Sequence, residues 1–125
     1  TSESKAELEA VLSKDEILAY QQLIKKVPLT DNVLEYAVSL VAKTRPDSPK
    51  AHALAKTYLE WGAGPRASQY LIYGAKCHAL MNGKYSPDIE DVKAVASAVL
   101  GHRIVRNFKA EAEGYSEEKI IGELL

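Results

Sequence analysis

The sequence predicts an all-α fold, a small bundle of four to five helices in a single domain. Several segments carry apolar residues every three or four positions, residues suited to helix caps precede them, and no convincing run alternates as a half-buried strand does. With 125 residues, of which 46% are hydrophobic, the chain is long enough to bury one core without a metal or a disulfide. An architecture of this kind does not by itself name a function.

The first two helices are predicted on either side of Pro28. Ser13 and Glu16 have the spacing of a capping box, so we expect the first helix to begin there. Thr30 is the expected cap of the second helix, which ends before Pro46. The first helix carries a stripe of Ile17, Tyr20 and Ile24. The second carries a broader apolar face of Val33, Leu34, Ala37, Val38 and Val41.

The middle of the chain contains one ambiguous segment and one clear helix. Residues 51–60 begin with helix formers and end in an alternating TYLEW that is compatible with a strand, and we favour a helix. Residues 65–82 are apolar on nearly all sides, which is typical of a helix surrounded by others. Gly83 is the expected end of this helix, because glycine is the usual residue after a helix C-terminus.

Two further helices are predicted in the last third. Ser86 is the expected cap of the first, and Pro87 occupies its first position. A short helix follows Ser116, and residues 101–114 are expected to form a connector between the two. The first of these helices has an apolar stripe of Ile89, Val92, Val95, Ala96 and Val99.

The composition excludes several classes of protein. Sixteen Lys and Arg against seventeen Asp and Glu give a net charge of -1, without the basic excess of a nucleic-acid-binding domain. The single cysteine, Cys77, excludes an internal disulfide and a thiolate zinc site, and we expect it to be a packed thiol. No apolar run reaches the roughly 18 residues of a membrane span, and no signal-peptide pattern is present. We therefore expect a cytoplasmic protein without membrane or nucleic-acid partners.

The chain also lacks the residues of a self-sufficient active site. The Gly83-Lys84 pair is not a P-loop, because Tyr85 follows it and His78 stands where the first glycine should be. The three histidines, His52, His78 and His102, do not have the spacing of a catalytic triad or a paired metal site. We expect His78 to be a core or boundary histidine with a hydrogen-bonding partner.

One arginine stands at an unfavourable place. In the stretch EWGAGPRASQ, Pro65 is suited to the first position of a helix, which puts Arg66 at the second. A cation there costs about 0.3–1 kcal/mol unless an anion compensates it. Gly62 and Gly64 would let a ligand or another backbone approach, and a guanidinium matches phosphate oxygens. The pattern therefore predicts an anion-binding helix start.

Simpler interpretations stand beside this one. Arg66 can be solvated or paired with an acid such as Glu60. Trp61 is expected to be a local core anchor, because large aromatic side chains dominate small cores.

A second basic group lies in GHRIVRNFK and allows the same two kinds of interpretation. It can belong to the anion surface or to a subunit contact, but we favour a solvated loop. The basic residues of this group are His102, Arg103 and Arg106, and the apolar residues expected to pack on the bundle are Ile104, Val105 and Phe108.

Three segments, in order, carry a resemblance to a known family. EWGAGPRASQYLI, SPDIEDVKAVASAVLGHRI and NFKAEAEG together resemble the C-terminal lid domain of MoxR-type AAA+ ATPases, with similarity from about Val11 to the end of the chain. The combination of a GxGPRAS or GASPRAS motif, a D-V/I-x-x-V helix and an L-x-HRI segment is specific. Gly64 stands where many members have serine.

The resemblance implies a role for Arg66. It matches the sensor-2 arginine, which contacts ATP phosphate and couples lid position to hydrolysis, and Gly64 and Pro65 belong to the same motif. ATP and Mg would be held by an α/β core that lies outside this sequence, so the chain alone would hydrolyse nothing. Residues 1–10 would be a polar lead-in from that core, and residues 11–125 the helical lid.

The resemblance also implies partners. The parent would be a ring-forming, usually hexameric ATPase that acts as a chaperone in the maturation of, or metal insertion into, other proteins. The lid would contact its own core and neighbouring subunits. Proteins with von Willebrand factor A domains are frequent partners in the family.

Two other function classes remain open from the sequence. The first is a free-standing helical module that binds a protein partner through an apolar groove or the HRIVRNFK stretch, and its binding would survive Arg66→Ala. The second is a helix-turn-helix DNA-binding domain, which the apolar helix after Pro65 and the net charge disfavour.

Overall fold

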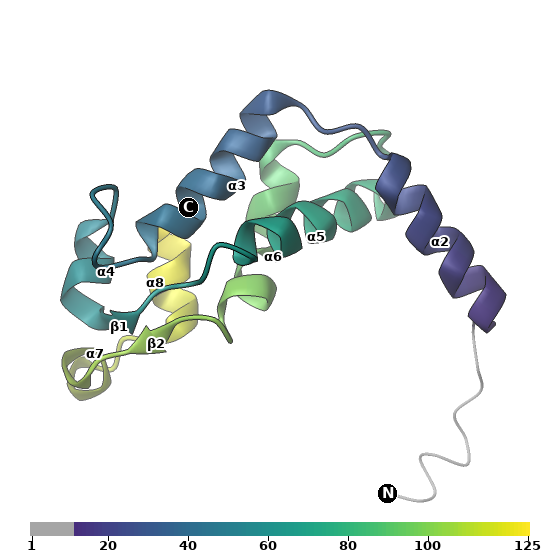
Figure 1. Cartoon of the computed structure of the whole chain (residues 1–125). Coiled ribbons are helices and arrows are strands. Elements are labelled where there is room, and N and C mark those ends of the chain that lie inside the picture. The colour runs from purple at the N-terminus through teal and green to yellow at the C-terminus, as the bar shows by residue number, and fades with distance from the viewer. Residues whose placement is uncertain (1–11) are drawn as a thin grey trace, which may run out of the picture.

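The computed structural model describes residues 12–125, in which seven helices and one two-stranded sheet form an all-α fold (Figure 1). The expected lead-in, residues 1–10, lies outside the described part of the chain. The all-α prediction is confirmed, with seven helices in the described residues in place of the four to five expected, and one of the two six-residue helices lies in the segment predicted to be a connector. The elements are α2 (Lys14–Lys26), α3 (Asp31–Lys43), α4 (Ala53–Tyr58), β1 (Leu59–Trp61), α5 (Ala67–Met81), α6 (Ile89–Leu100), β2 (Val105–Arg106), α7 (Phe108–Glu113) and α8 (Glu117–Leu124).

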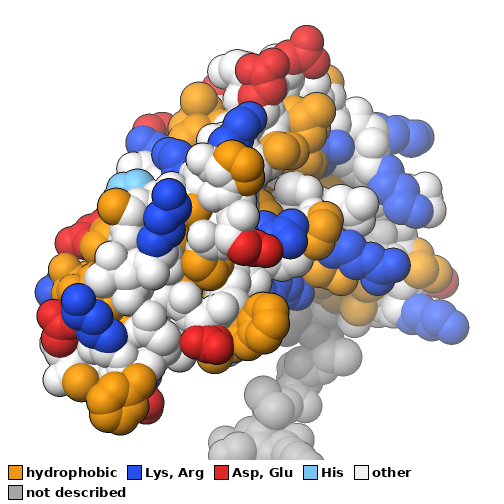
Figure 2. All heavy atoms as spheres, turned by 60° about the vertical axis from the view of Figure 1, so that its left-hand side comes forward, with side chains coloured by type: hydrophobic (Ala, Val, Ile, Leu, Met, Phe, Trp, Pro, Cys, Tyr) orange, Lys and Arg blue, Asp and Glu red, His pale blue; other side chains and the backbone are white. Residues whose placement is uncertain are grey.

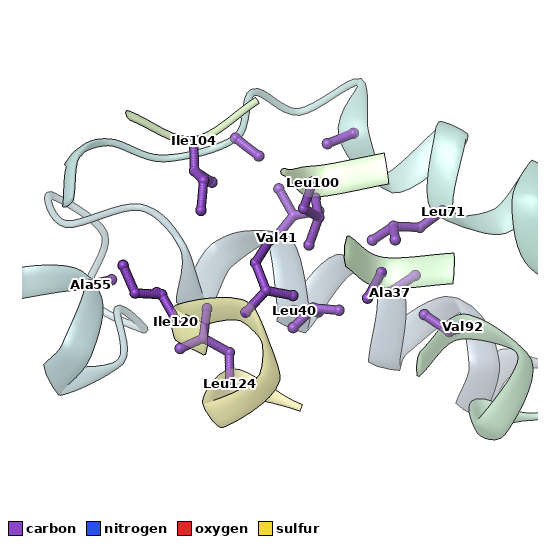
Figure 3. Close-up of a cluster of buried hydrophobic side chains, with 14 of the residues drawn as sticks. Ala37, Leu40, Val41, Ala55, Leu71, Val92, Leu100, Ile104, Ile120 and Leu124 are labelled. Carbon is purple, nitrogen blue, oxygen red and sulfur yellow. The ribbon is translucent and has the colours of Figure 1, made fainter. Parts of the chain in front are cut away.

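The core lies where α3, α5, α6 and α8 meet. Helix α5 packs most extensively against α6, α3 packs against both, and α8 closes against α6. Leu40 and Val41 from α3 lie near Ile120 and Leu124 from α8 in this core (Figure 3). Each of these four side chains is buried, so apolar burial holds the bundle together.

Several predicted caps are confirmed. The capping box at α2 has both bonds, from the Ser13 N–H to Glu16 Oε1 at 3.2 Å and from the Glu16 N–H to Ser13 Oγ at 3.1 Å. Ser116 Oγ accepts from the Lys119 N–H at 3.1 Å at the start of α8. Gly83 adopts a left-handed φ of 75° directly after Asn82, the C-cap of α5, as its predicted role at the helix end requires.

The ambiguous segment contains both structures that its sequence suggested. Helix α4 occupies its first part, and β1 follows directly and pairs antiparallel with β2. Asn107 joins the residue after β2 to the end of α4. Its N–H donates to the Tyr58 carbonyl at 2.9 Å, and its side-chain Nδ2 donates to the Thr57 carbonyl at 2.8 Å. The predicted connector therefore contains β2 and α7.

Burial corrects the predicted environment of three helices. Helix α5 is not surrounded, since only one ridge of small and apolar residues is buried; it consists of Ala67, Leu71, Ala75 and Ala79. In α3 the buried residues are Val33, Ala37, Leu40 and Val41, whereas Leu34 and Val38 are exposed. In α2 no residue is buried, and the helix projects from the rest of the bundle (Figure 1). Its predicted stripe contributes nothing to the described core.

Helix α6 begins two residues later than expected. Its cap is Asp88 and not Ser86, and Pro87 is buried before the helix. Asp88 has the extended conformation of a cap residue, and its N–H donates to Asp91 Oδ2 at 2.7 Å, as in a capping box. The predicted stripe is otherwise correct, with Val92 and Ala96 buried and Ile89, Val95 and Val99 packed against the core.

Candidate functional site

Arg66 lies at the start of α5, with its side chain exposed. It is the residue before the first helical position, whereas the sequence placed it at the second. The difference arises because the chain enters the helix through a tighter turn, in which the Ala67 N–H donates to the Gly64 carbonyl at 3.0 Å and the Gln69 N–H to the Arg66 carbonyl at 3.0 Å. The positive end of the helix dipole still lies beside the guanidinium.

Of the two simpler interpretations of Arg66, pairing with Glu60 is not observed, whereas the side chain is exposed to solvent. Among residues 12–125, no acidic side chain lies within ion-pair distance of Arg66. Within the same residues, nothing accepts a hydrogen bond from the Arg66 backbone N–H. The exposed guanidinium therefore stands beside a backbone donor that has no partner among residues 12–125, an arrangement suited to an anion.

The glycine loop, residues 62–65, rests on the end of α3. A Cβ added to Gly62 would lie 2.3 Å from the Thr44 carbonyl oxygen and 2.6 Å from Arg45 Cα, so the two backbones touch. The buried Thr44 hydroxyl accepts from the Ala63 N–H at 3.0 Å. A Cβ at Gly64, by contrast, would meet nothing within 4 Å, so the fold leaves that position open.

Two open hollows flank the glycine loop, with volumes of about 420 and 390 Å³. Arg45 and Asp47 line both of them. Pro65 and Ser68 complete the first hollow, and Trp61 contributes to the second. The space beside the α5 start is thus bordered by a second cation and an acid that the sequence did not single out.

Trp61 is not a core anchor. It lies on β1 opposite Val105, and 67% of its surface is exposed. The two strands are short and present one face to solvent, so a large side chain in β1 has no second layer to pack against. The prediction for Trp61 is therefore wrong.

The second basic group is mostly engaged within the chain. Arg106 donates to the Tyr115 carbonyl at 2.8 Å and pairs with Glu117 at 3.2 Å. Arg103 donates to the Val99 carbonyl at 2.7 Å, and its guanidinium lies 4.4 Å from the centre of the Tyr70 ring. Tyr70 follows Arg66 by one helical turn, so Arg103 is the member of the group that the fold brings toward the α5 start.

The other members of that stretch divide between core and surface. His102 is exposed and Ile104 is buried as expected. Val105 is about half exposed, and Phe108 is 85% exposed, so neither packs onto the bundle as predicted. Phe108 opens the six-residue helix α7, whose buried contact is made by Ala110 alone.

His78 has the partner expected of a boundary histidine. Its Nδ1 lies 2.6 Å from Asp91 Oδ1, and Lys84 pairs with the other carboxylate oxygen. Burial raises the pKa of Asp91, but the bonds from Lys84, the Asp88 N–H and His78 outweigh it and hold the pKa below its ordinary value. This cluster ties the end of α5 to the start of α6.

The described residues contain no other candidate centre. No group of three or more His, Cys, Asp or Glu in residues 12–125 could hold a metal ion. Cys77 is half-buried, and burial raises the pKa of its thiol, which makes it a weak nucleophile. No helix within the described range has the length and apolar character needed to cross a membrane.

Comparison with known proteins identifies the family. Residues 51–124, which include the glycine loop, Arg66 and everything from α5 to α8, match the AAA lid domain. The chain belongs to this family. The MoxR-type resemblance is confirmed as well, so the chain is an AAA+ lid domain of the MoxR type.

Individual relatives agree with this assignment. The chain is 30% identical over 115 residues to chaperone MoxR1 of Mycobacterium tuberculosis, covering 92% of this chain and 30% of the relative. It is 29% identical over 118 residues to the uncharacterized protein YeaC of Bacillus subtilis, covering 94% of this chain and 34% of the relative. A crystal structure of a candidate ATPase from Cytophaga hutchinsonii superposes with a TM-score of 0.82 at 34% identity, covering 93% of this chain and 35% of that one. The chain therefore spans about a third of the length of these proteins.

Sequence reasoning missed Thr44, Arg45 and Asp91. Thr44 meets the glycine loop across 19 residues of sequence, and Asp91 meets His78 across 13. A threonine at a helix end and an acid in a first helical turn are both common for local reasons, so neither pattern signals a distant partner. Pro46 was interpreted only as the stop of a helix, although it also indicates the turn that follows Thr44 and Arg45.

Proposed function

We propose that this lid domain closes over ATP held by the rest of a longer protein, and that Arg66 contacts the terminal phosphate. The observation that carries this proposal is the exposed guanidinium at the α5 start without an acidic partner in the described part of the chain. A preorganised cation stabilises the charge that develops in phosphoryl transfer, and the helix dipole adds to the same field. Gly64 and Pro65 shape the turn that presents it.

The family adds the context for this role. We infer that the full-length protein binds ATP with Mg²⁺ in a core outside this chain and hydrolyses it as an oligomeric ring, hexameric by family resemblance. Residues 1–10 would lead in from that core. Chaperone MoxR1 matches over nearly the whole of this chain, which supports a chaperone-like parent. By family resemblance alone, its partners would include proteins with von Willebrand factor A domains.

Arg66→Ala in the full-length protein tests the proposal. We expect a loss of ATP turnover on the order of 10²-fold or more, because the variant removes a charge-stabilising group from the transition state. Arg66→Lys keeps the charge but not the two-pronged geometry, so it should recover only part of the rate. Lys109→Ala is the control, since this exposed cation lies on α7, away from the α5 start.

One outcome would contradict the proposal. If Arg66→Ala leaves both the ATPase rate and the nucleotide affinity of the full-length protein unchanged, Arg66 has no nucleotide role.

A helical interaction module without a nucleotide role has less support. The observation that favours it most is the exposure of Phe108, Val105 and Trp61, of which Trp61 and Val105 lie opposite each other in the β1–β2 sheet. However, Figure 2 turns this end of the molecule toward the viewer and shows its hydrophobic side chains in separate groups among charged ones. A face of this kind lacks the single continuous apolar patch that marks a strong protein interface.

A further inference from the structure

We propose that Thr44 is a positioning residue for Arg66. Its buried hydroxyl, together with the missing side chain at Gly62, holds the glycine loop on the end of α3 and thereby sets where α5 presents the arginine. This inference rests on the function proposed above and adds to it the residues that orient the phosphate-contacting group.

The first support is the hydrogen bonding of the Thr44 hydroxyl. Thr44 is completely buried, although threonine is a polar residue. Its Oγ1 donates to the Val41 carbonyl at 2.6 Å and accepts from the Ala63 N–H at 3.0 Å. A hydroxyl can donate one hydrogen bond while it accepts another, so it serves a carbonyl of α3 and an amide of the loop at once. No apolar side chain of the same shape can do this.

The second support is the backbone contact at Gly62. Any Cβ there would overlap the Thr44 carbonyl oxygen, at 2.3 Å, and the Arg45 Cα, at 2.6 Å. Real Cβ atoms do not approach backbone atoms so closely, so the loop would have to lift from α3. Gly62 has no positive φ, and close approach is therefore the reason for a glycine at this position.

The third support is the short path from the hydroxyl to the arginine. Ala63, which donates to Thr44, and Ala67, the first residue of α5, are both buried. Arg66 lies between these two anchors, and three residues of chain span at most about 10 Å. A shift of the Ala63 anchor is therefore transmitted to Arg66. Displacements of about 1 Å in a catalytic group can lower a rate on the order of 10²-fold.

The hydroxyl can be removed without changing the shape of the side chain. In the full-length protein, Thr44→Val keeps the branched shape and removes both hydrogen bonds, whereas Thr44→Ser keeps the hydroxyl. We expect Thr44→Val to lower kcat/KM for ATP on the order of 10-fold, and Thr44→Ser to restore most of it. Gly62→Ala, which leaves Thr44 intact, should give the same loss by lifting the loop and provides a second variant if Thr44→Val does not fold.

Two readouts separate positioning from general stability. Amide hydrogen exchange should become faster in residues 63–69 of Thr44→Val, while the α5–α6 contact around Leu71 and Ala96 stays protected. In an Arg66→Ala background, Thr44→Val should lower turnover by less than about 2-fold, because the group that it positions is already absent.

The outcomes distinguish this inference from the proposed function. Unchanged exchange in residues 63–69, or an equal loss of turnover with and without Arg66, overturns the role of Thr44 and leaves Arg66 as the nucleotide contact. Unchanged turnover in Arg66→Ala overturns the nucleotide role itself. In that case the positioning of a phosphate-contacting group is overturned with it, whatever the exchange of residues 63–69 shows.

Discussion

Helices α2 and α8 are both amphipathic, yet they differ completely in burial. The eight residues of α8 bury Ile120, Ile121 and Leu124, whereas none of the thirteen residues of α2 is buried. Helix α2 contacts the bundle mainly along α5, and the chain is fixed only after the helix, at the buried Val27. An apolar stripe therefore shows that a helix has a face to bury, but not whether a partner within the same domain covers it.

The largest expected effect comes from truncating one large side chain in each helix and comparing the losses in the free energy of unfolding. Ile120→Ala in α8 should lower the free energy of unfolding by about 2–5 kcal/mol, because it leaves a cavity in the core. Leu18→Ala in α2 should change it by less than about 0.5 kcal/mol, since Leu18 is exposed. Urea denaturation of both variants measures the difference. Equal losses of stability in the two variants would show that α2 is packed in solution, and the difference in burial between α2 and α8 would then be wrong.

The buried carboxylate between α5 and α6 provides the next largest effect. Asp91→Asn should cost about 1–3 kcal/mol, because the amide cannot replace the charged bonds to Lys84 and His78. The folded pKa of Asp91 is lowered, so the unfolded chain binds the proton more readily. The stability from this group is therefore complete above about pH 4 and is lost as the pH falls through the lower folded pKa.

Denaturation at several acidic pH values measures this effect. We expect the wild-type chain to lose more stability than Asp91→Asn as the pH falls below about 4. Parallel curves for the two proteins would mean that Asp91 does not hold a lowered pKa.

The smallest expected effect comes from removing the serine cap at the start of each of the two helices. Ser13 and Ser116 each accept an N–H at 3.1 Å, at the starts of α2 and α8. Ser116→Ala should lower the global free energy of unfolding by about 1 kcal/mol, because α8 is part of the core. Ser13→Ala should leave global stability nearly unchanged and should instead speed hydrogen exchange within α2. The same global loss in both variants would contradict the independence of α2.

In the candidate site as well, features set by neighbouring residues were predicted better than features set by residues far apart in the chain. The short motif of Pro65 and Arg66 marked the start of α5 correctly to within two residues, because caps and turns depend on neighbouring residues. The environment of Trp61 was predicted wrongly, because its exposure depends on whether another layer covers the β1–β2 sheet. Asp91 lies in the first turn of α6, where an acid is common for local reasons, and only the packing of α5 against α6 makes it the buried partner of His78.

The helical class and the positions of most helix starts and ends could be read from the sequence alone. They follow from capping, backbone preference and apolar period, each of which acts over a few neighbouring residues. The family was indicated by a different kind of evidence, the resemblance of three ordered motifs. Only the tertiary structure decided that Thr44 meets Ala63, that Gly62 has no room for a side chain and that α2 buries nothing. These contacts join residues far apart in the chain, and their geometry depends on how the finished helices pack.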